Sequence, residues 1–77
     1  MAKHELAYDY SKLRGRIKEV FGTQEAFAQA IGLTERSVSL KITSKRSWKQ
    51  DEIISSINVL NLTTDDIKPY FFVVKVQ

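Results

Sequence analysis

Cysteine is absent from the sequence, which excludes a disulfide framework, a thiol nucleophile and a cysteine-ligated zinc site. Long apolar runs are absent too: none approaches the roughly 20 residues that span a bilayer, and the first residues, MAKHELAYDY, lack the apolar core of a signal peptide. Three glycines and one proline are too few for a disordered chain. We therefore expect a folded, soluble, cytoplasmic protein that does not contact a membrane.

The residue combinations needed for catalysis are missing as well. No nucleophile, base and orienting group fall together, and no glycine-rich phosphate loop is present. The single histidine, His4, stands in the N-terminal segment and cannot form a metal site alone. We expect a protein that is not an enzyme and that has no cofactor, no metal and no small-molecule ligand.

Positive charge is concentrated in one part of the chain. The net charge of +3 is by itself a weak indication of a polyanionic partner. Residues 35–49, however, hold five basic side chains against a single acid, Glu35, whereas residues 50–77 are net negative. At 77 residues the chain supports one small domain. The basic segment is either a binding surface of that domain or an ordinary solvated face.

The apolar spacing predicts an all-α fold of five helices. One side of the first helix is apolar, at Tyr10, Leu13, Ile17 and Val20. The predicted helices span residues 10–21, 24–31, 35–42, 48–60 and 64–68, and Pro69 should halt the last one. The expected organisation is a flexible N-terminal arm at 1–9, a domain at 10–72 and a β-prone tail at 73–77. The predicted core consists of Leu13, Ile17, Phe27, Ile31, Val38, Ile53, Ile57 and Ile67, with Trp48 as a lid.

Capping residues mark the ends of several predicted helices. Asp9 or Ser11 is placed to cap the start of the first helix, and Gly22 is placed to end it. Two later pairs are spaced as capping boxes, Ser47 with Gln50 and Thr63 with Asp66.

A tight crossing of two helices is predicted by the positions of four residues along the chain. They are Gln24, Ala28, Gly32 and Val38. Where two helices cross closely, only a small side chain such as Ala28 lets the second helix approach the first. Gly32 can take the positive φ that the turn needs, and Val38 fills the space between the helices. Thr23 and Thr34 supply hydroxyl caps just ahead of the two helices.

With Phe27, Ile31 and Leu33 completing the apolar set, this stretch resembles the helix-turn-helix of phage Cro and repressor proteins. The segments GTQEAFAQAIGLTERSVSLKI, WKQDEI and DDIKPYFF, in this order, look like the small Cro/repressor-type regulators of phages and prophages of Gram-positive bacteria. The resemblance covers roughly residues 8–72. It implies a five-helix, sequence-specific transcription regulator that occupies an operator on double-stranded DNA, as a homodimer or as paired monomers on a palindrome.

In that arrangement the 24–31 helix lies across the DNA backbone, and the 35–42 helix, the recognition helix, enters the major groove. By position, the resemblance assigns base contacts to Thr34, Glu35, Arg36, Ser37, Ser39, Leu40 and Thr43. Arg36 could donate two hydrogen bonds to guanine, and Glu35 could accept one from cytosine. Contacts with the DNA backbone fall to Thr23, Gln24, Lys41, Lys45, Arg46 and Lys49.

Lys41 departs from the family pattern, because many relatives carry an apolar residue three positions after the buried valine. The aliphatic stem of Lys41 could cover the core edge while its ammonium reaches a phosphate. The rotation of the 35–42 helix is therefore open, and with it whether Leu40 meets a thymine methyl group or the protein interior.

The tail permits two interpretations. Val73, Val74 and Val76 cannot all be buried by so small a domain, so the tail is either a strand that pairs with a second chain or a loose end, and self-association is slightly favoured. Exposed apolar residues there also support an alternative function, a protein-interaction module such as an antitoxin or an anti-repressor on the same fold.

Overall fold

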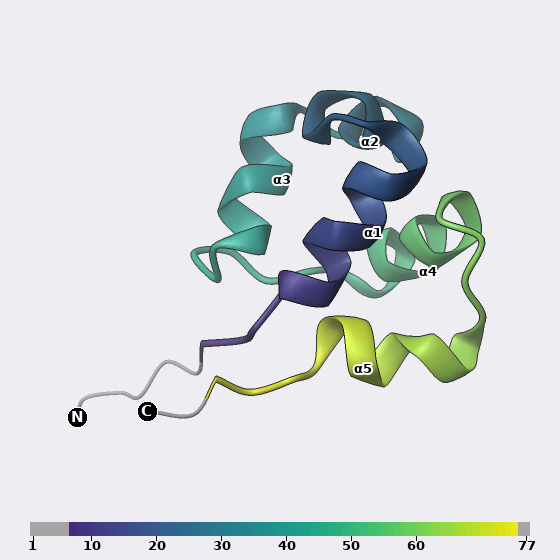
Figure 1. Ribbon diagram of the computed structural model, residues 1–77. Coiled ribbons are helices and arrows are strands. Elements are labelled where there is room, and N and C mark those ends of the chain that lie inside the picture. Colours follow the sequence, from purple (N-terminus) through teal and green to yellow (C-terminus); the bar gives the residue numbers. More distant parts are fainter. Residues whose placement is uncertain (1–6, 76–77) are drawn as a thin grey trace.

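The computed structural model describes residues 7–75, which form five α-helices and one 3-10 helix (Figure 1). The elements are α1 (Ser11–Phe21), α2 (Gln24–Ala30), α3 (Glu35–Ile42), α4 (Gln50–Val59), the 3-10 helix η1 (Thr64–Asp66) and α5 (Ile67–Phe71). The predicted all-α fold class is therefore confirmed. Among the helices of residues 7–75, none combines the length and the apolar character needed to cross a membrane.

The core lies where the helices meet around α1, with α2 and α3 at one end, α4 at the side and α5 beneath (Figure 1). Its most deeply buried large side chains are Leu13, Phe27, Val38, Leu60 and Phe71. Ile31 and Ile67, both predicted core residues, are half-buried at its edge, and Val20 is 37% exposed. Trp48 is a lid as predicted, packed edge to face on Phe71.

Hydroxyl caps begin α2 and α3 as predicted. Thr23 Oγ1 accepts a hydrogen bond from the Ala26 amide, and Thr34 Oγ1 accepts one from the Ser37 amide, each at 3.1 Å. Each bond satisfies a backbone amide that has no partner inside its helix. Gly22 ends α1 with a φ of 81°, a conformation that other residues rarely adopt.

The start of α1 differs from the prediction. Its N-cap is Tyr10, whose side chain makes no capping bond, whereas Asp9 accepts hydrogen bonds from the hydroxyl and the amide of Ser11. These two hydrogen bonds lower the pKa of the Asp9 carboxyl. The predicted box of Thr63 with Asp66 does form, since the Thr63 amide donates to Asp66 Oδ2 at 2.9 Å.

The predicted capping box of Ser47 with Gln50 is wrong. The fourth helix begins at Gln50, two residues later than expected, and its N-cap is Lys49. The Lys49 amide donates to Glu52 Oε1 at 2.9 Å, so an acid three residues after the cap stabilises the helix start. Two pairs of residues have the spacing of a capping box, Ser47 with Gln50 and Lys49 with Glu52. The pair that contains the carboxylate is the one that forms.

The prediction that Pro69 halts the last helix is also wrong. Pro69 is the third residue of α5, and the helix continues to Phe71. In the first turn of a helix the backbone amides have no intrahelical acceptor, so the amide that proline lacks is not missed there. The helix thereby carries Phe71 into the core, where only 1% of its surface is exposed.

A close crossing joins α2 to α3. Ala28 and Val38 have no exposed surface, which agrees with the small-residue contact expected from their spacing. Gly32 has a φ of 76°, and the Leu33 amide donates to the Ala28 carbonyl at 2.9 Å. The chain therefore turns sharply after α2, and α3 leaves in a new direction.

The first and last described residues pair with each other. Tyr8 and Val74 form an isolated antiparallel bridge. Two backbone hydrogen bonds flank it, from the Asp9 amide to the Val73 carbonyl at 2.7 Å and from the Lys75 amide to the Ala7 carbonyl at 2.8 Å. In Figure 1 the purple start and the yellow end of the coloured trace run side by side.

This pairing corrects two predictions. Residues 7–9 are not part of a flexible arm, and residues 73–75 are not loose, because each segment supplies hydrogen-bond partners to the other. His4 and Val76, which were assigned to the arm and the tail, lie outside the described residues.

Two glycine substitutions should have opposite effects on stability. Around both Gly32 and Gly15 a Cβ would meet no heavy atom within 4 Å. Gly32→Ala should therefore cost about 1 kcal/mol from its positive φ alone, whereas Gly15→Ala, inside α1, should stabilise by about 0.5–1 kcal/mol. Urea unfolding followed by circular dichroism measures both, and a stabilising Gly32→Ala would contradict the described turn.

Candidate nucleic-acid interface

Most of the residues predicted to contact bases lie on the outward side of α3. Exposed side chains among them are Thr34, Glu35, Arg36, Ser39 and Thr43, and half-buried ones are Ser37 and Leu40. The packing of Val38 and Ile42 against the core turns this side outward. Arg36 and Ser39 therefore do not point into the protein, as they would if the helix were rotated.

Two residues near the end of α3 also make internal contacts. The Thr43 hydroxyl donates to the Ser39 carbonyl at 2.8 Å, so its hydrogen is used within the helix. The Leu40 carbonyl accepts the amides of Lys45 at 2.8 Å and Arg46 at 3.2 Å, which folds the following loop back onto the helix end. The Leu40 side chain is half-buried, so it lies between the two environments left open by the sequence.

Lys41 does not belong to the predicted DNA-backbone contacts. Its surface is only 3% exposed, and its Nζ lies 3.0 Å from Glu52 Oε1 on α4. The same ammonium donates to the Ser47 carbonyl at 2.9 Å and lies 6.0 Å from the centre of the Trp48 ring. With these partners inside the protein, the ammonium cannot reach a phosphate, and the prediction is wrong.

The reason lies in the periodicity of α3. Val38, Lys41 and Ile42 fall on one side of the helix, and that side faces the core. A lysine at such a position keeps its charge only if an acid is buried with it. Glu52 supplies that acid, so the ion pair also ties α3 to α4.

Opposing effects act on the Glu52 carboxyl. Burial alone would raise its pKa, because it disfavours the charged form. Hydrogen bonds from the Lys49 amide and the Lys41 ammonium, together with the positive charges of both lysines, outweigh burial and lower the pKa below the ordinary value of 4.5. Glu52 is therefore ionised at neutral pH.

The other predicted backbone contacts are open to a ligand to different degrees. Lys45, Arg46 and Lys49 are exposed, and none of them belongs to an ion pair within residues 7–75, where the pairs are Arg16–Glu19 and Lys41–Glu52. Thr23 is exposed, although its hydroxyl accepts the cap hydrogen bond described above, and Gln24 is half-buried.

Two residues that position this surface were not singled out from the sequence. Glu52 is the first, although a lysine at a core position of α3 is a signal that a buried acid must lie nearby. Ser44 has a φ of 64°, and its hydroxyl accepts the Tyr8 amide at 3.1 Å, which joins the loop after α3 to the first described residues. The residues next to Ser44 in the sequence predict neither its positive φ nor its hydrogen bond with Tyr8.

Comparison with known proteins finds a matching family and a similar solved structure. The sequence matches the family described as "Protein of unknown function (DUF739)" over residues 6–74. The chain belongs to the DUF739 family. This DUF739 member is also similar to the solution structure of the modulator of repression (MOR) of the temperate bacteriophage TP901-1 from Lactococcus lactis. The two sequences are 54% identical, the match covers 91% of this chain and 95% of that chain, and the TM-score is 0.76. No curated protein matches the chain.

Removing the acid of the buried pair should cost more stability than removing the base. Glu52→Ala leaves the Lys41 ammonium buried without its carboxylate and also removes the acceptor of the Lys49 amide, so we expect a loss of about 3 kcal/mol. Lys41→Met fills the same space, and Glu52, with 13% of its side chain exposed, can still bind water, so the loss should be smaller. Urea unfolding measures both, and equal losses would contradict the assigned asymmetry.

The same pair should make stability depend on pH. Because the pKa of Glu52 is lower in the folded than in the unfolded state, its contribution is present above the unfolded value near 4.5 and is lost as pH falls through the folded value. Thermal unfolding between neutral and acidic pH should therefore show a steeper loss of stability below about pH 4.5 in the unmodified protein than in Glu52→Gln. Identical pH profiles would contradict this assignment.

Proposed function

We propose that the chain is a sequence-specific DNA-binding regulator whose α3 enters the major groove of an operator. The observation that carries this proposal is the outward placement of Glu35, Arg36 and Ser39 on a helix whose other side is fixed to α2 and α4. A helix fits the major groove, where each base pair displays a distinct pattern of donors and acceptors. Arg36 would donate to guanine and Glu35 would accept from a cytosine amine.

Attraction to the phosphates would come from Lys45, Arg46 and Lys49, which are exposed near the end of α3 and the start of α4. Each phosphate contact releases a counterion, so affinity falls with salt with a log–log slope of about −0.9 per contact. Three contacts give a slope near −3 for each protomer bound. Two copies on a palindrome would double this value and would block access of polymerase to the promoter.

The similar phage protein supports a regulatory role. That relative is named a modulator of repression of a temperate phage, and more than half of its aligned residues are identical to those of this chain. We infer that this chain modulates repression in a phage or prophage, in the cytoplasm of a bacterial host.

A second candidate function is an anti-repressor, which would modulate repression by binding a repressor protein. The structure offers one observation in its favour. The charge of Lys41 is balanced by Glu52 inside the protein, and the acid Glu35 is exposed on α3. The outward face of α3 is therefore less basic than the sequence indicates. A weakly basic face is less suited to DNA and more suited to a protein surface.

Selection of bound duplexes from a random pool tests the first function. We expect an inverted repeat bound in the nanomolar range, with affinity that falls as salt rises. Glu35→Ala combined with Arg36→Ala should weaken binding at least about tenfold and relax the base preference. The matched control is Asp65→Ala with Lys68→Ala, an exposed acid and base on η1 and α5, elements that lie away from α3 in Figure 1. Absent or salt-independent binding would favour the protein partner.

A further inference from the structure

A groove lies between the loop that follows α3 and the paired chain ends. Its volume is about 460 Å³, within the roughly 300–1,000 Å³ typical of binding sites. Five aromatic side chains line it: Tyr8, Tyr10, Trp48, Phe71 and Phe72. No residue assigned to base contacts belongs to its lining, so the groove is a separate surface beside α3.

The walls of the groove are held in place before any ligand arrives. The Trp48 ring packs edge to face on Phe71, with centroids 5.2 Å apart, and Tyr8 packs in the same way on Phe72 at 6.2 Å. On the other side, the hydrogen bond from the Tyr8 amide to Ser44 fixes the loop. A preformed site lowers the ordering cost of binding, because its own side chains need not be fixed by the ligand.

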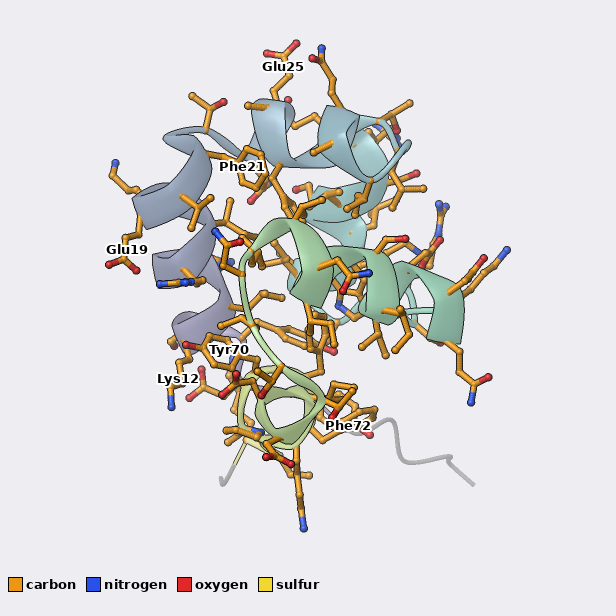
Figure 2. All side chains as sticks on the ribbon, turned by 90° about the vertical axis from the view of Figure 1, so that its right-hand side faces the viewer. Lys12, Glu19, Phe21, Glu25, Tyr70 and Phe72 are labelled. Carbon is orange, nitrogen blue, oxygen red and sulfur yellow. The ribbon has the colours of Figure 1, made fainter. Side chains whose placement is uncertain are left out.

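Exposed apolar surface continues from the groove. Phe72 is 48% exposed, and Figure 2 shows it at the outer edge of the molecule, beside α5. The next two residues along the chain, Val73 and Val74, are 42% and 46% exposed. Exposed apolar side chains next to a concave site are typical of a surface that another molecule covers.

The rim of the groove is positively charged. Lys45 and Arg46 line it, both are exposed, and neither belongs to an ion pair within the described part of the chain. No aspartate or glutamate is among the lining residues. Charge complementarity therefore requires an occupant with negative charges next to an apolar group.

We propose that this groove binds an acidic segment of another protein, which inserts one large apolar side chain among the rings and places aspartate or glutamate against Lys45 and Arg46. Single-stranded nucleic acid is also anionic, but bases bind by stacking on open ring faces. In this groove Tyr10 and Phe71 are only 6% and 1% exposed, and the exposed surface beside it is partly aliphatic, at Val73 and Val74. The proposal does not depend on DNA binding by α3.

A selection from a random-peptide library tests the proposal on the unmodified chain. We expect enriched peptides that combine a large apolar residue with several acids and that change the fluorescence of Trp48, the single tryptophan of the sequence. Phe72→Ala should weaken their binding at least about tenfold, the loss typical of an anchoring aromatic. Ile54→Ala on α4, which removes a side chain of similar exposure (45%) outside the groove, should leave binding unchanged.

Charge reversal provides the second readout. Lys45→Glu with Arg46→Glu should abolish binding of the acidic peptides, whereas Lys18→Glu with Lys68→Glu, exposed on α1 and α5, should not. All the substituted side chains are exposed, so each variant should fold, and circular dichroism checks that it does.

Five results would overturn the proposal. Four of them are a selection without enrichment, enriched peptides that lack acids, binding that both Phe72→Ala and charge reversal leave intact, and tighter groove-dependent binding of an oligothymidine than of any peptide. A dimer that dissociates on Phe72→Ala would assign the groove to a second copy of this chain and would overturn it as well. Lys45 and Arg46 are also assigned to phosphate contacts, so base reading by α3 is tested separately, through Glu35 and Arg36, which do not line the groove.

Discussion

The rotation of α3 about its own axis decides which of its side chains face outward, and the buried ion pair of Lys41 with Glu52 fixes that rotation. Turning the helix far enough to expose Lys41 would withdraw Val38 and Ile42 from the core. Keeping those two residues buried without Glu52 would leave an ammonium unpaired in a poorly hydrated place, at a cost of several kcal/mol. The pair makes close apolar packing compatible with a buried charge, and every statement about the outward face of α3 depends on it.

Two neighbouring surface regions adjoin the loop that follows α3. On one side is the polar face of α3, with Arg36 as its exposed cation. On the other is the aromatic groove, where Lys45 and Arg46 stand at the rim. The loop between them is short and is held by the carbonyls at the end of α3 and by Lys41 itself, which binds the Ser47 carbonyl.

Local chemistry made much of the fold predictable, whereas contacts between distant residues did not. The hydroxyl caps at Thr23 and Thr34 and the positive φ of Gly32 follow from neighbours within a few positions, so the spacing predicted α2, the turn and α3 correctly. The partner of Lys41 is eleven residues away on another helix, and no local rule identifies it. The bridge between Tyr8 and Val74 spans nearly the whole chain, which is why the arm and the tail were misjudged.

Ala7 and Lys75 lie one hydrogen bond apart, so the described part of the chain, residues 7–75, comes close to being a closed ring. A few glycines would join these positions, and new ends could then be opened elsewhere, as circular permutation requires. The exposed turn at Asn61, where φ is 59°, lies between α4 and η1 and would be a suitable place to cut. Fluorophores or fusion domains attached at this turn would stay clear of both the aromatic groove and α3.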